Sequence, residues 1–199
     1  MIEFINPKNE EPYLLFKELY DEAKNLNQKN IEAIAISSYD SSKKEVESRF
    51  VNLKYVNVSD WIFFSNYNSQ KATDFKSHNQ ISGLFFWNKI QVQIRIKANI
   101  YKISKELSDN HYGKRTIEKN ALAWSSDQSK TIISYDKVVE NYGNKIKFKE
   151  KLKSRPEHWG GYSFTPYYFE FWKGHKSRLN KRDVYELKNN EWCHSFIQP

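Results

Sequence analysis

Residues 47–71 decide the fold and read ESRFVNLKYVNVSDWIFFSNYNSQK. The first half of this stretch has the composition of a strand and carries two cations, Arg49 and Lys54, in an otherwise apolar setting. The second half holds another strand pattern, residues 61–64, followed by a polar corner and by Ser69 at the start of a helix. The stretch therefore predicts two successive strands that lead into a helix.

The two cations cannot both bind one small anion. A strand advances about 3.3 Å per residue, so the five steps from Arg49 to Lys54 cover roughly 16 Å. Five is an odd number, so strict alternation places the two side chains on opposite faces unless the strand twists or bulges between them. One interpretation is a long ligand along the strand, with a phosphate near one cation, a polar ring near the other, and a second phosphate contact from Ser69 and Lys71 at the helix start. The alternative is a barrel strand whose charges face water.

The rest of the chain adds strand and helix patterns around this stretch. Strict alternation of apolar and polar residues predicts a strand over 91–103. Further strand candidates are 33–37, 81–87, 167–172, 179–187 and 191–196, and helix candidates are 12–26, 69–79, 105–112, 117–124 and 135–149. A loop containing Pro156 and Gly160-Gly161 is expected before the last three strands.

These patterns predict a mainly β (α+β) fold. Strands in hairpin order with helices between them indicate an antiparallel barrel with peripheral helices. No glycine-rich turn joins a strand to a helix, which argues against a Rossmann nucleotide site. We expect residues 11–199 to form a single domain and residues 1–10 to be a flexible N-terminal segment.

Composition and charge exclude several classes of protein. The only cysteine, Cys193, allows no disulfide within the chain, and the five histidines lack metal-ligand spacing, so we expect no metal. The net charge of +8 would suit nucleic acid, but the cations are spread along the chain and no nucleic-acid motif occurs. No apolar run approaches membrane-spanning length, and the N-terminus has acids where a signal peptide needs positive charge. We therefore expect a cytoplasmic protein without a nucleic-acid or membrane partner.

Short motifs throughout the chain resemble those of one known family. They are Arg49-Phe-Val-Asn-Leu-Lys54, Phe63-Phe64-Ser65-Asn66, Ser69-Gln70-Lys71, Gln93, Ala123-Trp124-Ser125 with Gln128-Ser129, Trp159-Gly160-Gly161-Tyr162, Glu170-Phe171-Trp172, Arg178-Leu179 with Arg182, and the closing Pro199. In this order they resemble the pyridoxine (pyridoxamine) 5′-phosphate oxidase family over residues 11–199. Colinear agreement of this length is far more specific than any single motif.

The resemblance implies a split barrel that works as a homodimer, with flavin mononucleotide (FMN) bound at the subunit interface. It assigns Arg49 and Lys71 to the FMN phosphate, with Ser65 assisting. The other cofactor-binding residues that it implies are Phe50, Val51, Asn52, Leu53, Lys54, Phe64, Gln70, Gln93, Gln128, Ser129, Trp172 and Arg182. Gln70 stands where the family has an arginine, so one charge-assisted phosphate contact is missing or comes from another cation. We still expect FMN to bind.

On the substrate side, the resemblance implies a phosphate held by Lys54, His111, Arg115 and Lys119 and a ring oriented by Arg178 and Asn180. Three of these positions depart from the family: His111 stands at a tyrosine, Lys119 at a serine and Asn180 at a histidine. Asn180 forms hydrogen bonds but cannot exchange a proton near neutral pH. Turnover should fall if this position does acid–base work, whereas little is lost if it only orients the ring.

The resembling family oxidises pyridoxamine or pyridoxine 5′-phosphate to pyridoxal 5′-phosphate, with dioxygen as acceptor and hydrogen peroxide as product. We therefore expect an FMN-dependent oxidoreductase of vitamin B6 biosynthesis or salvage. Three alternatives stay open. One is a split-barrel oxidoreductase that acts on a different substrate, and another is a non-catalytic protein that binds flavin or pyridoxal phosphate. The third and weakest is a basic nucleic-acid binder.

Overall fold

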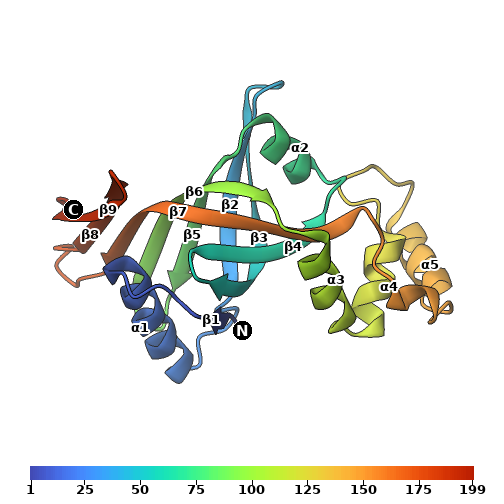
Figure 1. The fold of residues 1–199 in the computed structure, drawn as a ribbon, viewed down its shortest axis with the longest axis horizontal. Helices are drawn as coiled ribbons and strands as arrows, with labels where there is room; N and C mark the ends of the chain where they lie inside the picture. The colour runs from blue at the N-terminus through green and yellow to red at the C-terminus, as the bar shows by residue number, and fades with distance from the viewer.

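Nine strands and five α-helices make up the computed structural model, which describes all residues from 1 to 199 (Figure 1). The helices are α1 (Glu11–Asn25), α2 (Gln70–Ser77), α3 (Lys105–Gly113), α4 (Ile117–Ser125) and α5 (Tyr135–Lys145), with a 3₁₀ turn, η1, at Lys151–Lys153. The strands are β1 (Glu3–Ile5), β2 (Ala33–Asp40), β3 (Glu45–Asn57), β4 (Asp60–Asn66), β5 (Gln80–Trp87), β6 (Val92–Lys102), β7 (Trp159–Lys173), β8 (Lys181–Lys188) and β9 (Glu191–Phe196).

Six of the strands close into a ring. They pair antiparallel in the order β3, β2, β5, β6, β7 and β4, and β4 returns to β3. From β7 the sheet continues into β8 and β9, which lie at the opposite end of the molecule from α3, α4 and α5 (Figure 1). The ring is irregular, because the β3–β4 pairing shifts register between Leu53 and Tyr55 and the β6–β7 pairing between Lys97 and Ala98. The predicted mainly β (α+β) barrel with peripheral helices is thus confirmed.

The core fills the ring and follows from the alternation of its strands. In β5 every second residue is buried, and in β6 the same holds from Val92 to Ile100. Helix α1 covers the core with an apolar face, and its Phe16 ring packs against Trp61 with the ring centroids 4.4 Å apart. Burying one such side chain contributes about 1.5–3 kcal/mol, so packing against α1 and across the ring holds the fold together.

The first residues of the chain belong to the sheet. Strand β1 pairs in parallel with β3 at Tyr55–Asn57, and Ile2 is part of the core. The backbone amide of Ile2 also donates a hydrogen bond to the Tyr20 hydroxyl, at 3.0 Å. The segment 1–10, predicted to be flexible, therefore contains a short strand that is attached to β3.

Two predicted boundaries were wrong by four residues or more. Helix α5 ends at Lys145 and not at Lys149. Strand β7 begins at Trp159, so Gly160 and Gly161 lie inside a strand and not in the predicted loop. These glycines let neighbouring side chains approach the backbone closely. A Cβ on Gly160 would collide with the Tyr67 ring, and one on Gly161 would collide with the Ile103 side chain.

We expect Gly160→Ala to lower the free energy of unfolding by about 1–3 kcal/mol, because the added methyl meets a packed aromatic ring. Gly143→Ala is the matched control, since no atom lies within 4 Å of its Cβ position in α5. That change should raise the free energy of unfolding by about 0.5–1 kcal/mol through helix propensity. Urea unfolding measures both values, and equal effects of the two substitutions would contradict the close-approach explanation.

Candidate functional site

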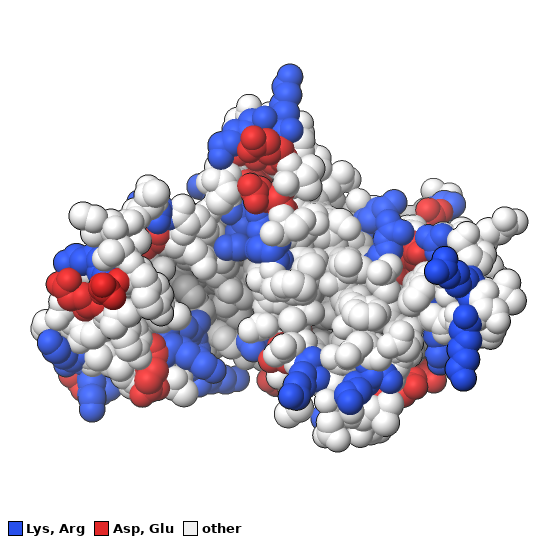
Figure 2. Space-filling view, turned by 180° about the vertical axis from the view of Figure 1, so that it is seen from behind, with Lys and Arg blue, Asp and Glu red and all other residues white.

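A cavity of about 850 Å³ lies between the strand ring and the helical group. Strands β3 and β4 form one side, and α3, α4 and the loop after α4 form the other. Figure 2 shows the molecule from behind, with Lys and Arg side chains at the hollow beside the helical group. The predicted site residues that line the cavity are Arg49, Phe50, Val51, Asn52, Lys54, Phe64, Ser65, Lys71, His111, Arg115, Lys119 and Gln128.

A β-bulge at Lys54 interrupts the pairing of β3 with β4 beside this cavity. Leu53 pairs with Phe63 and Tyr55 pairs with Ile62, so Lys54 is the extra residue. The bulge shifts the alternation of β3 by one residue. Arg49 and Lys54 both line the cavity, as do Phe50, Val51 and Asn52 between them, so this part of β3 contributes side chains from both of its faces.

Lys71 marks one end of the cavity, which we call the α2 end. Its Nζ lies 3.3 Å from Ser69 Oγ and 3.3 Å from Gln128 Oε1, and Ser65 Oγ donates to the same Gln128 oxygen. Burial lowers the pKa of Lys71, and the nearby Arg49 charge lowers it further. Because Lys71 forms no ion pair, an anion in the cavity would stabilise its charge.

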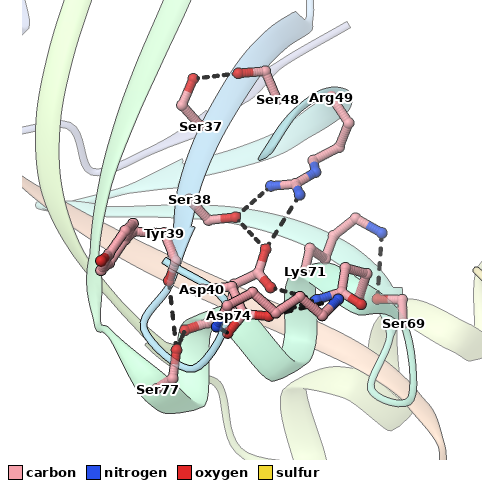
Figure 3. A network of polar contacts seen from close by, with 12 residues as sticks. Ser37, Ser38, Tyr39, Asp40, Ser48, Arg49, Ser69, Lys71, Asp74 and Ser77 are labelled. Atoms are coloured by element: carbon pink, nitrogen blue, oxygen red, sulfur yellow. Dashed lines mark hydrogen bonds and ion pairs between the residues drawn. The ribbon is translucent and has the colours of Figure 1, made fainter. Parts of the chain in front are cut away.

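A buried carboxylate holds Arg49 at the same end. Arg49 Nη2 lies 3.2 Å from Asp74 Oδ2, and Arg49 Nη1 donates to Ser38 Oγ at 2.5 Å (Figure 3). Ser38 in turn donates to Asp74 at 2.6 Å, and the Asp74 side chain is fully buried. These contacts fix the guanidinium where α2 meets the rim of β2 and β3. They also offset part of its charge.

Leu53 and Gln70, two residues of the predicted cofactor set on β3 and α2, do not line the cavity. Leu53 is fully buried in the core. Gln70 Nε2 donates to Asp40 at 3.2 Å and to Asp74 at 3.0 Å. The amide of Gln70 therefore bridges two carboxylates behind Arg49.

The other end of the cavity, which we call the α3–α4 end, gathers four cations from three elements: Lys54, Lys114, Arg115 and Lys119. The Arg115 guanidinium lies 4.1 Å over the Trp159 ring, and its Nε donates to Asn120 at 3.1 Å. Burial lowers the pKa of Lys54, whose only acidic neighbour is Glu32 at 4.0 Å. This end is more positive than the α2 end, where Asp74 offsets Arg49.

His111 of α3 lies among these cations. Its ring stacks on Phe64 with centroids 3.7 Å apart and an interplanar angle of 8°. Its Nδ1 lies 2.8 Å from the Tyr55 hydroxyl oxygen. Burial, followed by the charge of Arg115 and the surrounding lysines, lowers the pKa of His111 to about 4. The imidazole is therefore neutral at neutral pH.

A second group of predicted residues lies on the sheet, away from the cavity of the same chain. Trp172 of β7 pairs with Gln93 of β6 on one side and with Arg182 of β8 on the other. Arg182 Nη2 contacts the buried Glu170 at 2.7 Å, which fixes its direction. These side chains share one face of three neighbouring strands.

Three further predicted residues also lie outside the cavity. Ser129 follows Gln128 with a φ of 72°. Arg178 has a φ of 58° and is exposed in the loop between β7 and β8, where Asn180 Oδ1 accepts a hydrogen bond from the His175 amide at 3.0 Å. One chain does not bring Arg178 and Asn180 to Lys54. Most of the predicted set thus forms two groups, one in the cavity and one on β6–β8 with the β7–β8 loop, while Leu53, Gln70 and Ser129 lie outside both.

Sequence reasoning missed the residues that orient the predicted ones, namely Ser38, Tyr55, Asp74 and Trp159. Asp74 had a usable signal, because it follows Gln70 by four positions on a predicted helix and so shares its face. Tyr55 had none, since its direction depends on the bulge at Lys54.

Comparison with known proteins places the chain in a family. It is 34% identical over 190 residues to the pyridoxine/pyridoxamine 5′-phosphate oxidase of Leptospira biflexa, which covers 95% of this chain and 89% of that protein. The chain belongs to the pyridoxine/pyridoxamine 5′-phosphate oxidase family. The relative of the same name from Cytophaga hutchinsonii is 40% identical over 147 residues, 72% of this chain and 67% of its own. The enzyme assignment predicted from the motifs is confirmed.

The family's "Pyridoxine 5′-phosphate oxidase C-terminal dimerisation region" matches residues 159–199, which hold β7, β8 and β9. Among solved structures, PhzG from Burkholderia lata 383, in complex with tetrahydrophenazine-1-carboxylic acid, has a TM-score of 0.90 at 24% identity and covers 98% of this chain and 95% of its own. A pyridoxamine 5′-phosphate oxidase-related, FMN-binding protein from Nostoc punctiforme has a TM-score of 0.74 at 11% identity, covering 92% and 97%. These likenesses show that the fold is the split barrel of this oxidase family. No helix of this chain is long and apolar enough to cross a membrane.

The low pKa of His111 predicts a pH dependence of stability. An unfolded histidine has a pKa of about 6.5. Between pH 6.5 and pH 4, His111 is therefore protonated in the unfolded chain and neutral in the folded chain. The contribution of His111 is complete above pH 6.5 and is lost as the pH falls toward 4. We expect a loss on the order of 1–3 kcal/mol, allowing for partial exposure.

Urea unfolding over this pH range measures the effect. His111→Gln should flatten the corresponding part of the profile, because glutamine cannot take the proton. His175→Gln, which changes an exposed histidine, is the matched control. A profile with the same slope in the wild type and in His111→Gln would contradict the prediction.

Proposed function

We propose that the protein oxidises pyridoxamine or pyridoxine 5′-phosphate to pyridoxal 5′-phosphate with FMN as cofactor, consuming dioxygen and releasing hydrogen peroxide. The observation that carries the proposal is a single cavity with cations at two separate places on β3, each suited to one phosphate. The names of the relatives support the substrate class.

The α2 end fits the phosphate of FMN. We assign that phosphate to Lys71, which has no ion-pair partner, and to Arg49, with Ser65 assisting. FMN would supply the two-electron acceptor that dioxygen reoxidises. Phe50, Val51, Asn52, Lys54, Phe64 and Gln128 would line the bound cofactor as cavity residues, with Ser129 next to Gln128.

The α3–α4 end fits the phosphate of the substrate. Lys54 and Arg115 supply charge, Arg115 is held flat by Trp159, and His111 and Lys119 complete the contacts. Binding both phosphates fixes the two rings against each other, and such orientation can account for much of a rate enhancement.

The second group would complete the site from the other subunit of a homodimer. The dimerisation region carries Trp172, Arg178, Asn180 and Arg182, and these residues lie away from the cavity of their own chain. We assign Gln93, Trp172 and Arg182 to the flavin ring, and Arg178 and Asn180 to the orientation of the substrate ring.

A second candidate is oxidation of a different substrate on the same flavin. It is favoured by His111 and Lys119, which depart from the family pattern and both line the α3–α4 end, and by Asn180. The PhzG structure with the same fold holds tetrahydrophenazine-1-carboxylic acid, so this fold also accommodates another ring system.

An aerobic assay with added FMN tests the proposal. We expect peroxide release with pyridoxamine or pyridoxine 5′-phosphate, and about 100-fold or more lower kcat/KM with the unphosphorylated vitamers. The reason is that two charge-assisted contacts, each worth about 1.5–3 kcal/mol, are lost with the phosphate.

Asn180→His distinguishes the two candidates. A large gain in turnover with the vitamers would show that the native site suits another substrate, whereas little change would show that this position only orients the ring. No peroxide with either phosphorylated vitamer, from a protein that binds flavin, would sink the first candidate and favour the second candidate or a non-catalytic binder.

The phosphate assignment predicts a specific loss of FMN affinity. Lys71→Met should weaken FMN binding about 10–150-fold, because one charge-assisted contact disappears, and should leave riboflavin binding unchanged. Lys76→Met, an exposed lysine on the same helix, is the matched control. Fluorescence quenching in a titration measures the FMN and riboflavin affinities of the wild type and of both variants. Equal losses for FMN and riboflavin would show that Lys71 does not contact the phosphate.

A further inference from the structure

Tyr55 and His111 form a pair at the α3–α4 end that the proposed reaction does not by itself require. We infer that Tyr55 fixes His111 in the tautomer whose Nε2–H faces an anion in the cavity, and that a doubly charged anion binds there together with a proton taken up by His111. This inference deepens the proposed function and rests on it for the identity of the anion, a phosphate monoester.

The ring of His111 is held on two sides. Phe64 stacks on one face at 3.7 Å, and the Tyr55 ring meets it edge-on at 5.4 Å and 89°. The Tyr55 hydroxyl lies 2.8 Å from Nδ1, on the edge of the ring away from Nε2. Nε2 has no hydrogen-bond partner in the protein, and His111 lines the cavity. A fixed ring therefore offers one free nitrogen to a ligand.

In the inferred arrangement Tyr55 donates to Nδ1, which is one of the two directions that the 2.8 Å contact allows. Burial and then the Glu3 carboxylate raise the pKa of Tyr55, so its hydroxyl keeps its proton and can donate it. When it donates to Nδ1, the ring proton of neutral His111 must lie on Nε2. The opposite tautomer would direct a lone pair at the anion, which repels it. Tyr55 is thus a positioning residue that acts through His111.

The charges that face His111 explain why it is neutral without a ligand. Cations come from β3, from the segment after α3 and from α4: Lys54, Lys114, Arg115 and Lys119. The acids nearby act on the neighbours of His111 and not on His111 itself: Glu32 lies beside Lys54, and the charge of Glu3 acts on Tyr55. Together with burial, the cations hold the pKa of His111 near 4.

A bound dianion reverses this balance. Two negative charges beside Nε2 offset the repulsion from the cations, so the protonated imidazole becomes more stable. The Tyr55 hydroxyl can rotate and accept a hydrogen bond from the newly protonated Nδ1–H, because a hydroxyl is both donor and acceptor. Binding then takes up a proton, and the affinity for the anion rises as the pH falls below the pKa of the occupied site. A tyrosine in place of His111 would bind the anion without this dependence.

Nitrogen NMR on the full chain with ¹⁵N-labelled histidine and added FMN tests the inference. Sulfate is the probe, because it stays doubly charged between about pH 5 and pH 8 and so contributes no titration of its own. His111→Gln identifies the His111 signals by their loss. Without sulfate we expect a neutral ring protonated at Nε2. With sulfate raised until the signals stop moving, the His111 pKa should rise by at least about one unit, a tenfold change in proton affinity.

Tyr55→Phe tests the positioning role and keeps the aromatic ring. In this variant we expect a mixture of the two tautomers and a sulfate affinity lowered about 3–10-fold, in line with one hydrogen bond. A ring protonated at Nδ1, an unchanged His111 pKa at saturating sulfate, or no response of His111 to sulfate would each overturn the inference.

These outcomes are separable from the proposed function. If the protein has no oxidase activity but His111 behaves as described, the proton-coupled subsite is supported and the oxidase proposal is contradicted. If the protein is an active oxidase but His111 takes up no proton, only the proton-coupled subsite is contradicted.

Discussion

The bulge at Lys54 is the constraint on which the site depends. β3 pairs with β4 across the bulge, and both strands belong to a closed ring, so the shift in alternation cannot be undone by sliding one strand. Arg49 before the bulge and Lys54 at the bulge both line the cavity. Leu53 and Val56 are both buried in the core although they are three positions apart, so the inserted residue turns Tyr55 out of the core and toward His111 of α3.

Buried acids make the two ends of the cavity unequal. Asp74 is shared by Arg49, Ser38 and Gln70, so the α2 end combines two cations with a carboxylate that is fully buried. Truncating one member of such a buried pair typically costs 3–5 kcal/mol, because the remaining charge loses its compensation. Arg49 thus ties α2 to β3 as well as facing the cavity. At the α3–α4 end the cations have no comparable partner, which leaves that end more dependent on a bound anion.

The sequence predicted the β architecture and much of the cavity, because alternation and motif spacing carry that information. Strand β6 and the cations Arg49, Lys54 and Lys71 are examples. It did not predict the start of β7, because Gly160 and Gly161 resemble a turn until Tyr67 and Ile103 are seen to occupy the space of their missing side chains.

Side-chain contacts between elements that are distant in the sequence could not be predicted either. The resemblance at Ser69-Gln70-Lys71 placed Gln70 among the cofactor-binding residues, yet its amide donates to Asp40 and Asp74. The pattern around β3 also did not indicate the contact between Tyr55 and His111, which depends on the register of β3 with β4. Both depend on which strand or helix lies opposite, and no local pattern records it.

Under the proposed function, the dimerisation region has a second role, because it carries predicted site residues that lie away from the cavity of their own chain. The β8–β9 arm projects from the ring at the end opposite α3–α5 and exposes Leu179 and Phe196 at 71% and 65% (Figure 1). Under the proposed function, a symmetric pair of chains would complete two equivalent cavities at once, because an isologous interface uses the same surface on both copies. A cofactor held by both subunits binds the dimer and not the separate chains, so it would stabilise the pair by mass action. Assembly and cofactor binding would then be one linked equilibrium, in which Glu170 contributes by fixing Arg182 before the partner arrives.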